Sequence, residues 1–452
     1  MRQQLVATFP DARRLVLVFE GWAAAPCLLD SVTAPEGYDV MAVWDYRDDS
    51  FDLDRVSRYD EIVIVAWSYG VAMAARFIDS CRLNITRRVA VNGTLHPVDA
   101  LRGIDPAMFR ATLDKLSARS VSKFYRRMAA GESNLRSLTL PERPVGELTD
   151  ELARIGRLAD DIPVSMWDTA LVADGDLIIP PEAQLRAWND EAYEVISIHG
   201  PHMPGFDTVI RRAVVSKEKV ARQFNRAAAT YDANAAVQAA VAERLAGMIG
   251  RGPLGDVLEP GCGTGCLTRL LPKCKSLMLW DIATDGFKLE RDAILRECDA
   301  ETAIRELPAN SVDAIVSASA FQWFNSLPRF LDECARVLRP GGMLCFSTFG
   351  DSNFCQLDTV VPGRRLFPSL DTVTEMMPRG LDIVESHSEL RQVTFDTPMD
   401  VLRHLRATGV NGFNNPRLSV ADFVSRYPAN PDGTASLTYN PVYIKAINNK
   451  KS

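Results

Sequence analysis

Short apolar runs alternate with amphipathic stretches in both halves of this chain. In the first half, the pattern predicts strands and helices as follows: strands at residues 15–19, 39–43, 61–65, 87–91, 164–167, 170–173 and 192–198, and helices at 52–58 and 71–78. In the second half it predicts strands at 256–258, 276–280, 312–317 and 343–348, and helices at 265–271 and 328–338. Strands that alternate with helices are typical of parallel α/β sheets. The pattern therefore predicts two such sheets on one chain.

Two polar helical segments divide the pattern. Residues 105–160 interrupt the first alternation, and a charged stretch at 211–231 separates the two halves. We therefore expect the boundary near 213–218, with one domain at 1–213 and another at 217–452. A chain of 452 residues is long enough for two domains. The last five residues are expected to be disordered.

Composition narrows the class of protein. The chain is 47% hydrophobic and 24% charged, as globular proteins are, and its net charge of −7 argues against nucleic-acid binding. The sequence has no run of about 18 apolar residues, so it predicts no membrane span. Its first ten residues lack the apolar core of a secretory signal. The nine cysteines, an odd number, indicate reduced thiols and a cytoplasmic protein. Cys262 and Cys266 have no neighbouring ligands, so we expect no metal site.

Residues 66–70 (AWSYG) join a predicted strand to a predicted helix. A strand, a tight turn bearing Ser and a helix form the context of a nucleophile elbow. The first glycine of the usual motif is replaced here by Ala66. A Ser between a strand and a helix can also be a simple helix cap. Ser68 is thus the candidate nucleophile of a hydrolase.

Two further residues complete a hydrolase pattern. Asp176 follows a predicted strand, and His202 lies in the loop after the next one. The chain order Ser, Asp, His is that of α/β hydrolases. His202 would accept the Ser68 proton, and Asp176 would orient the imidazole. His199 is the alternative base and Asp174 the alternative acid, and the acid could be an ordinary turn residue.

An oxyanion hole should lie beside the same turn. Its donors would be the backbone N–H groups of Tyr69, directly after the nucleophile, and of Trp22, after the first strand. Gly21 lets the backbone turn toward the site. The Trp22 side chain could equally belong to the core.

The second half contains a glycine-rich loop, EPGCGTG, at residues 259–265. Such glycines let the backbone approach a cofactor, and an acidic residue at the end of the next strand, here Asp281, can bind ribose hydroxyls. By spacing alone, a dinucleotide would also fit. The arrangement resembles motif I of class I (Rossmann-like) methyltransferases, which implies S-adenosylmethionine (AdoMet) as co-substrate. The resemblance implies these cofactor-binding residues: Glu259, Gly261, Gly263, Gly265 and Asp281, with Asp299 and Ala300 at the adenine.

Several motifs of the first half together resemble one esterase family. They are FEGW (19–22), DYRD (45–48), AWSYG (66–70), VNGT (91–94) and KFYRRM (123–128). In this order they resemble the BioG-type esterases, which cleave the methyl ester of pimeloyl-acyl carrier protein (ACP). The resemblance implies an α/β-hydrolase fold with a helical lid at about 105–160. Lys123, Arg126 and Arg127 would then meet the acidic carrier protein, or would simply form a solvated helix face.

Motifs of the second half resemble a methyltransferase family over about 217–445. They are VARQFNRAAATYD (220–232), FQW (321–323), FST (346–348), TGVN (408–411) and LTY (437–439). They resemble the BioC-type malonyl-ACP O-methyltransferases, which implies methylation of a malonyl carboxyl on ACP or on coenzyme A. A cation or hydroxyl should orient that carboxyl. Tyr231, Tyr439 and Arg406 are candidates, each of which could instead be structural.

Both resemblances belong to early biotin synthesis, so the chain is interpreted as a bifunctional enzyme that acts on malonyl-ACP and on pimeloyl-ACP methyl ester. Two alternatives stay open. The second half could methylate a small free diacid, and the first half could be an unrelated esterase. The first half could also be an inactive docking module, which only the replaced elbow glycine supports.

Overall fold

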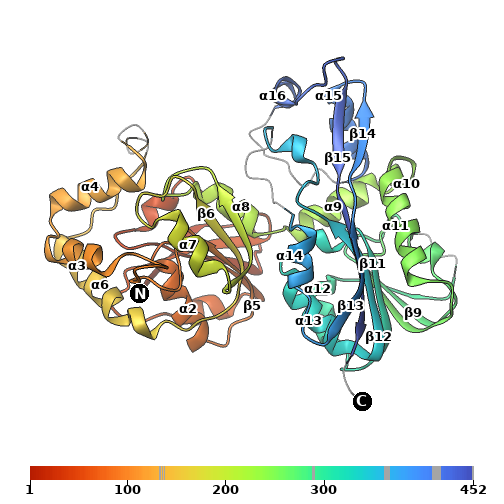
Figure 1. The fold of residues 1–452 in the computed structure, drawn as a ribbon, viewed down its shortest axis with the longest axis horizontal. Helices are drawn as coiled ribbons and strands as arrows, with labels where there is room; N and C mark the ends of the chain where they lie inside the picture. The colour runs from red at the N-terminus through yellow and green to blue at the C-terminus, as the bar shows by residue number, and fades with distance from the viewer. Residues whose placement is uncertain are drawn as a thin grey trace. The chain divides into compact units, whose positions relative to one another are not determined.

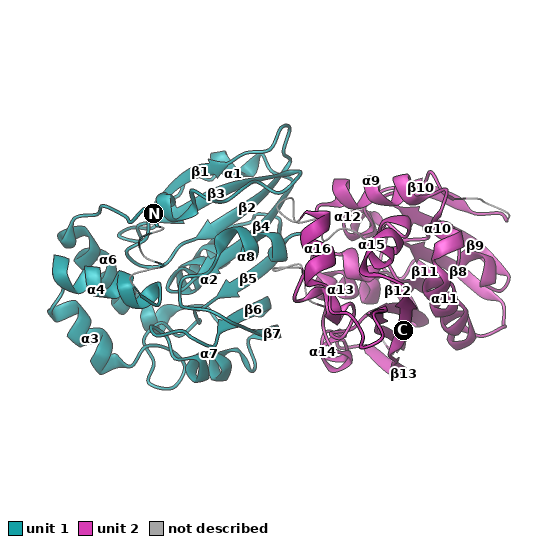
Figure 2. Ribbon diagram, turned by 90° about the horizontal axis from the view of Figure 1, so that it is seen from above, with its two compact units in different colours: residues 1–214 teal, residues 215–452 magenta. Residues whose placement is uncertain are grey.

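The computed structural model describes residues 1–131, 134, 136, 138–287, 291–360, 367–409 and 419–449. The chain divides into two compact units, Met1–Val214 and Val215–Ser452, coloured separately in Figure 2. The TGVN motif at 408–411 lies partly outside the described residues, as do the last three residues of the chain. No helix among the described residues is long and apolar enough to cross a membrane.

Unit 1 is built on a seven-stranded sheet. In chain order its strands are β1 (Arg2–Ala7), β2 (Arg14–Phe19), β3 (Tyr38–Trp44), β4 (Glu61–Trp67), β5 (Ile85–Val91), β6 (Trp167–Ala173) and β7 (Ala192–Ile198). Their order across the sheet is β1-β3-β2-β4-β5-β6-β7. β1 pairs antiparallel with β3, whereas the other strands are parallel. The sheet is therefore mixed, because an edge strand that the sequence pattern did not predict is added to it.

The helices of unit 1 cover this sheet and extend beyond it. They are α1 (Asp54–Ser57), α2 (Gly70–Ser80), α3 (Pro106–Asp114), α4 (Ala118–Met128), α6 (Val145–Leu158), α7 (Pro181–Trp188) and α8 (Phe206–Ala213). The strands β2, β4 and β6 are almost wholly buried, as strands are when both faces of a parallel sheet are covered. Figures 1 and 2 show α3, α4 and α6 gathered at one side of the unit.

Unit 2 contains a second seven-stranded sheet and a two-stranded one. The strands are β8 (Leu254–Pro260), β9 (Cys274–Asp281), β10 (Ile294–Glu297), β11 (Val312–Ala318), β12 (Leu338–Phe349), β13 (Leu381–Ser388), β14 (Arg391–Phe395), β15 (Ala435–Tyr439) and β16 (Pro441–Asn448). The order of the large sheet is β10-β9-β8-β11-β12-β16-β13, and β14 pairs with β15. The neighbouring strands β10, β9, β8, β11 and β12 are parallel to one another, and β16 is antiparallel to both of its neighbours, β12 and β13. This mixed sheet has the Rossmann-like arrangement of methyltransferases.

The helices of unit 2 are α9 (Lys217–Ala227), α10 (Tyr231–Asn234), α11 (Ala236–Ile249), α12 (Ala300–Ala303), α13 (Leu327–Val337), α14 (Leu370–Glu375), α15 (Pro398–Ala407) and α16 (Val420–Arg426). One apolar core lies at the sheet, around Val257, Leu279 and Cys345. Another joins α15 and α16 to the β14–β15 pair, around Leu405, Phe423 and Leu437. The unit therefore carries a small, separately packed cap on its main sheet.

The helix predicted at 265–271 was wrong. The structure has a single 3-10 turn, Thr268–Leu270, in its place. Gly263 and Gly265 have left-handed φ values of +55° and +87°, and Pro272 lies two residues after the turn. These residues prevent a regular helix from starting or continuing. The glycine loop therefore lacks the helix N-terminus that a phosphate-binding loop normally uses.

Candidate functional sites

The turn at Ser68 is a strained junction between β4 and α2. Ser68 has φ +57°, a left-handed value that is costly for a residue with a side chain. Glycines make room for the turn: a Cβ on Gly70 would lie 2.3 Å from the Phe19 carbonyl oxygen, and one on Gly93 would lie 2.2 Å from that of Ser68. Ala66 lies inside the buried strand β4, paired with Phe19. The close approaches therefore fall at positions 70 and 93 and not at 66.

The structure brings Ser68, His202 and Asp176 together. His202 Nε2 is 2.9 Å from Ser68 Oγ, and His202 Nδ1 is 2.8 Å from Asp176 Oδ2. The side chains of His202 and Asp176 are completely buried. A hydroxyl, an imidazole and a carboxylate in this chain of hydrogen bonds can activate the hydroxyl as a nucleophile.

Neighbouring donors hold the acid in place. Asp176 Oδ1 accepts the backbone N–H groups of Ile178 at 2.7 Å and Ile179 at 3.0 Å. Asp176 Oδ2 also accepts from Nε2 of Gln184 at 2.8 Å. With the imidazole, these donors satisfy the carboxylate and leave it one orientation toward His202.

The alternative acid and base lie elsewhere. His199 Nδ1 is 3.0 Å from Asp174 Oδ2, and the two side chains are 96% and 56% exposed. This pair holds the pKa of the Asp174 carboxyl below its usual value and raises the pKa of His199. The structure does not bring either residue to Ser68.

Asn92 is a residue of this site whose part the sequence did not reveal. Its Nδ2 donates to the His202 carbonyl at 2.8 Å, and its Oδ1 accepts the N–H of Ala173 at 2.8 Å. Trp67 Nε1 donates to the same His202 carbonyl at 2.8 Å. Asn92 also has a left-handed φ of +46°. It therefore ties the histidine loop to the ends of β5 and β6, which only the folded sheet brings together.

The Trp22 and Tyr69 amides lie beside the nucleophile. A Cβ on Gly21 would be 2.9 Å from Ser68 Cβ, so the backbone leading into Trp22 runs against the serine. Among the described residues, neither amide donates a hydrogen bond to a protein oxygen. Two free N–H groups next to a nucleophile can stabilise an oxyanion.

The helices between residues 105 and 160 are attached to the sheet by buried polar contacts. Trp22 Nε1 donates to the Leu148 carbonyl at 2.9 Å. Glu151 of α6 is fully buried, accepts the Tyr46 N–H at 2.9 Å, and pairs with Arg143 at 2.8 Å. Burial raises the pKa of Glu151, and Arg143 opposes that rise. These contacts attach α6 to the loops that follow β2 and β3.

Unit 2 contains a partly open cavity of about 1030 Å³, open solvent at its mouth included, which we call the large cavity. It lies at the carboxyl ends of β8, β9 and β11, where the strand order of the sheet reverses and where such sheets bind ligands. Of the residues predicted to bind the cofactor, six line it: Glu259, Gly261, Gly263, Asp281, Asp299 and Ala300. Gly265 does not, because it faces the Phe287 ring, which a Cβ there would approach to 3.1 Å.

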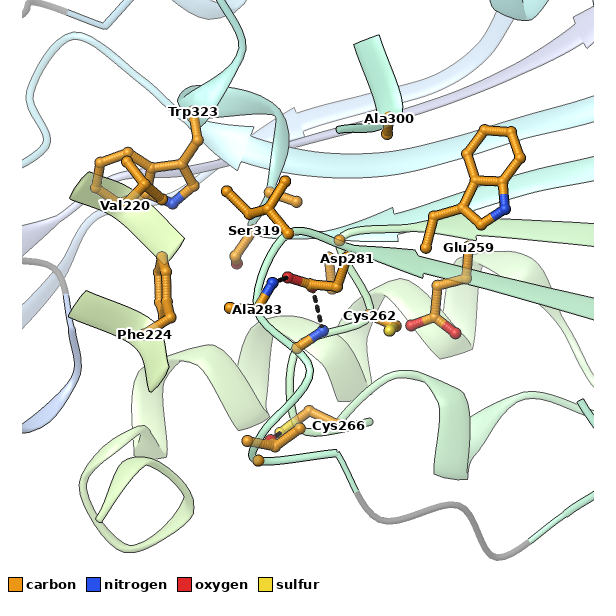
Figure 3. Close-up of a pocket in the computed structure, with 18 of the residues that line it drawn as sticks. Val220, Phe224, Glu259, Cys262, Cys266, Asp281, Ala283, Ala300, Ser319 and Trp323 are labelled. Atoms are coloured by element: carbon orange, nitrogen blue, oxygen red, sulfur yellow. Dashed lines mark hydrogen bonds between the residues drawn. The ribbon is translucent and has the colours of Figure 1, made fainter. Parts of the chain in front are cut away.

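Asp281 holds the glycine loop. Its Oδ2 accepts the Gly263 N–H at 2.7 Å, and its Oδ1 accepts the Ala283 N–H at 2.8 Å, as Figure 3 shows. Burial raises the pKa of Asp281 to about 6, although the backbone donors oppose the rise. The carboxylate is therefore mostly ionised at neutral pH and can accept hydroxyl donors.

Glu259 is the second acid of the large cavity and differs from the first. It is 1% exposed, and Thr268 Oγ1 donates to its Oε2 at 2.8 Å. Burial raises its pKa to about 8. Glu259 is thus mostly protonated at neutral pH, whereas Asp281 is mostly charged.

Lys217 is a lining residue that the sequence did not reveal. It is 2.6 Å from Glu301 and 3.3 Å from Asp299, and its ammonium lies 4.7 Å from the centre of the Phe324 ring. Asp299 also caps α12 by accepting the Glu301 N–H. No local pattern marks this lysine, because its partners are more than 80 residues away in the sequence.

A small cavity of about 340 Å³, open solvent included, adjoins the large one. Tyr231 and Tyr439, two of the residues predicted to orient the acceptor, line it. The Tyr439 hydroxyl is 2.6 Å from His404 Nε2, and burial lowers the pKa of His404. Arg406, the third candidate, is exposed on α15 and lines neither cavity.

Comparison with known families matches both halves of the chain. Residues 2–207 match the family described as Pimeloyl-ACP methyl esterase BioG, and residues 258–346 match a methyltransferase domain family. The crystal structure of BioG from Haemophilus influenzae is 31% identical, covering 45% of this chain and 94% of that one, with a TM-score of 0.42.

Curated relatives extend the match. The malonyl-[acyl-carrier protein] O-methyltransferase of Porphyromonas gingivalis is 32% identical over 51% of this chain and 96% of its own length. The protein of the same name from Bacteroides fragilis is 32% identical over 98% of this chain and 94% of its own length. The chain therefore belongs to the family of the Bacteroides fragilis protein, and it joins a domain that matches the BioG family to a methyltransferase domain.

Proposed function

We propose that this chain is a bifunctional enzyme of biotin synthesis. It methylates the free carboxyl of malonyl-ACP, or of malonyl-coenzyme A, with AdoMet, and it hydrolyses the methyl ester of pimeloyl-ACP. The observation that carries the proposal is the presence, on one chain, of the Ser68–His202–Asp176 hydrogen bonds and of the glycine-loop cavity. The Bacteroides fragilis relative, named for its action on malonyl-ACP, supports the same assignment over nearly the full length.

Residues 1–213 act as an α/β-hydrolase domain, and the helices between 105 and 160 form its lid. The strained elbow after β4 and the buried contacts that attach α6 to the sheet support this assignment. Lys123, Arg126 and Arg127 are exposed on α4 and give the lid a basic surface. An acidic carrier protein would dock on such a surface.

Ester hydrolysis follows from the hydrogen bonds of Ser68. His202 takes the Ser68 proton as the oxygen attacks the ester carbonyl, and the Trp22 and Tyr69 amides bind the resulting oxyanion. The carbon–oxygen bond to the methoxy group then breaks, and His202 gives its proton to the departing methanol. A water molecule, deprotonated by His202, releases the acid and restores Ser68. Asp176 stabilises the imidazolium throughout.

Residues 217–452 act as the methyltransferase domain. The backbone fits AdoMet: Gly263 has φ +55° and space beyond its Cα, and ionised Asp281 offers acceptors for ribose hydroxyls. Asp299 and Ala300 would border the adenine, and protonated Glu259 adds no second negative charge. AdoMet, when bound, supplies a methyl group to a carboxylate oxygen. The protein orients that oxygen and excludes water, and it needs no strong base because a carboxylate is already a nucleophile.

The two activities serve one purpose. A charged carboxylate would cost several kcal/mol in the apolar site of a chain-elongating enzyme, so methylation lets the malonyl group be elongated. Removal of the ester then ends elongation at pimeloyl. The methyltransferase domain would act first and the esterase domain last.

Mass spectrometry tests the proposal. Incubation with AdoMet should add one methyl group to malonyl-ACP, and incubation with pimeloyl-ACP methyl ester should remove one. Ser68→Ala should abolish the second reaction only. Ser80→Ala is a matched control, because among the described residues the Ser80 hydroxyl bonds only to the Phe77 carbonyl at the end of α2. Methylation of free malonate but not of malonyl-ACP would favour a small-diacid enzyme. Failure of Ser68 to react with a fluorophosphonate would favour an inactive docking domain.

A further inference from the structure

The small cavity opens beside the place where a methyl acceptor must lie. It shares Phe224, Tyr231, Gln238, Ser319 and Trp323 with the large cavity, so the two are direct neighbours. Figure 3 shows Phe224, Ser319 and Trp323 on one side of the large cavity, across from Glu259. Ser319 directly follows β11, the strand next to the glycine-loop strand β8. A group held in the small cavity would therefore face a ligand bound in the large one.

Buried polar atoms without hydrogen-bond partners gather around the small cavity. Among the described residues, the donors are Trp323 Nε1, Asn353 Nδ2 and Ser319 Oγ, and the acceptors are Gln238 Oε1 and Gln322 Oε1. A buried donor or acceptor left without a partner costs about 1–3 kcal/mol. Such atoms are rare in folded proteins, so a group of them around one cavity indicates a polar ligand.

Asn353 has a defined orientation. It is 0% exposed, and its Oδ1 accepts the Asn440 N–H at 3.1 Å. This contact identifies the oxygen of the amide, and it leaves both hydrogens of Nδ2 for another acceptor. Asn440 in turn is held by the Glu389 carbonyl at 2.9 Å. The donor is thus supported by the surrounding fold.

Ser319 carries a second indication of function. Its φ is +56°, and its N–H is bound by Ser347, with 3.1 Å to the carbonyl oxygen and 3.0 Å to Oγ. Left-handed backbone at a residue with a side chain costs about 1 kcal/mol or more and is concentrated at functional sites. The strained backbone presents a hydroxyl without a partner at the junction of the two cavities.

We propose that Asn353, Trp323 and Ser319 bind the free carboxylate of the acceptor in the small cavity. The inference rests on the proposed methyl transfer and names the residues that recognise its substrate. All three offer N–H or O–H donors, and a carboxylate accepts several of them at once. None of the described residues that line the small cavity is charged, and Phe349, Phe354 and Phe367 give it apolar walls. The cavity therefore suits a short acyl chain that ends in one carboxylate.

Neutral donors suit this reaction better than a cation would. A carboxylate oxygen forms a bond to the methyl carbon while the carbon–sulfur bond breaks and leaves its electron pair on sulfur. The negative charge of the acceptor and the positive charge of the sulfonium both disappear. A fixed lysine or arginine would stabilise the charged starting state more than the transition state, and so would slow the step. Neutral donors orient the oxygen with less of this penalty.

The test compares two carrier-protein ligands that differ by one carboxylate. The full-length enzyme is saturated with sinefungin, a non-reacting AdoMet analogue that keeps a positive charge, and titrated with malonyl-ACP or acetyl-ACP by calorimetry. The wild-type enzyme should bind malonyl-ACP more tightly. Asn353→Asp, which keeps the acceptor for Asn440 and replaces the donor by an oxygen, should reduce that preference by about ten- to a hundredfold. Each variant is kept saturated with sinefungin, and its affinity for acetyl-ACP should change less than its affinity for malonyl-ACP.

Two further variants complete the test, one that removes a second donor and one that serves as a control. Trp323→Phe removes only the Nε1 donor and keeps an aromatic ring, so it should weaken the malonyl preference even if Asn353→Asp fails to fold. Asn430→Asp is the matched control, because Asn430 Nδ2 bonds to the side chains of Thr434 and Ser436 and lines neither cavity. It should leave the preference intact.

The possible results distinguish failure of the proposed function from failure of the proposed carboxylate site. A wild-type enzyme that methylates neither malonyl-ACP nor malonyl-coenzyme A overturns the proposed function, and this inference with it. A wild-type enzyme that methylates malonyl-ACP, with an unchanged malonyl preference in both Asn353→Asp and Trp323→Phe, overturns only the carboxylate site. Hydrolysis at Ser68 in the same molecules shows that each variant is correctly made and folded in unit 1.

Discussion

Asp281→Asn should weaken AdoMet binding and remove its dependence on pH. Both carboxylate oxygens of Asp281 accept backbone N–H groups, from Gly263 and Ala283. An amide at this position would turn its NH₂ group against one of these donors, and the glycine loop would lose its charged anchor. A hydrogen bond to a charged group contributes about 1.5–3 kcal/mol, so AdoMet affinity at pH 7.5 should fall about ten- to a hundredfold.

The pH dependence follows from the raised pKa. With a pKa of about 6, most of Asp281 is ionised at pH 7 but only about one-tenth at pH 5. AdoMet is a cation that brings hydroxyl donors, so it binds the ionised form better and its affinity rises with pH through this range. Wild-type affinity should therefore be about tenfold lower at pH 5 than at pH 7. Glu259, with a pKa of about 8, titrates above this window and remains protonated within it.

Calorimetric titration with AdoMet between pH 5 and 7.5 measures both effects. Asp382→Asn is the control, since Asp382 is exposed on β13 and lines neither cavity. It should keep the wild-type affinity and pH profile. A flat wild-type profile, or a profile that persists in Asp281→Asn, would refute the assigned role of this carboxylate.

Three further predictions concern both units. His202→Ala should lower ester hydrolysis by about 10⁴-fold or more, whereas His199→Ala should leave it near the wild-type rate; rates that exchange between the two variants would show that the base is His199. Relative to the wild type, Glu259→Gln should raise the free energy of unfolding of unit 2 by a further amount of about 1.4 kcal/mol for each pH unit between pH 5 and pH 8, because Glu259 ionises near pH 4.3 in the unfolded chain and only near pH 8 in the folded one. A difference between variant and wild type that does not depend on pH in urea unfolding would contradict the raised pKa. The esterase should prefer pimeloyl-ACP methyl ester to malonyl-ACP methyl ester by about a hundredfold, since burying four extra methylenes contributes up to about 3 kcal/mol; equal values of kcat/KM would count against the lid.

The elements that could be predicted are those formed by a clear pattern of apolar and polar residues in adjacent positions. The apolar run before residues 66–70 predicts β4, and the amphipathic run after them predicts α2. The strand and helix pattern also predicted an α/β protein, although its sheets proved mixed. The edge strand β1 and the antiparallel strand β16 were missed, because an antiparallel strand added beside parallel strands changes no periodicity elsewhere in the chain.

The missed site residues share a physical cause. Asn92, Lys217 and Asn353, the last of them a proposed binding residue, each contact partners that are distant in sequence: the His202 loop, the α12 cap and the Asn440 backbone. Nothing about a single asparagine or lysine distinguishes one that clamps a loop from one that is solvated. The helix predicted after the glycine loop failed for the opposite reason, since a local pattern was overruled by left-handed glycines and a proline.

The sequence by itself predicted the two proposed chemistries of this protein, because a nucleophile elbow and a glycine loop are short segments whose backbone conformation depends on adjacent residues. It also determined the order of Ser68, Asp176 and His202, but it left two acids and two bases as alternatives. Only the tertiary structure decided which pair is buried against Ser68 and which is exposed at the surface. Burial, donor orientation and pKa depend on what packs around a group, and that is a property of the fold and not of the local sequence.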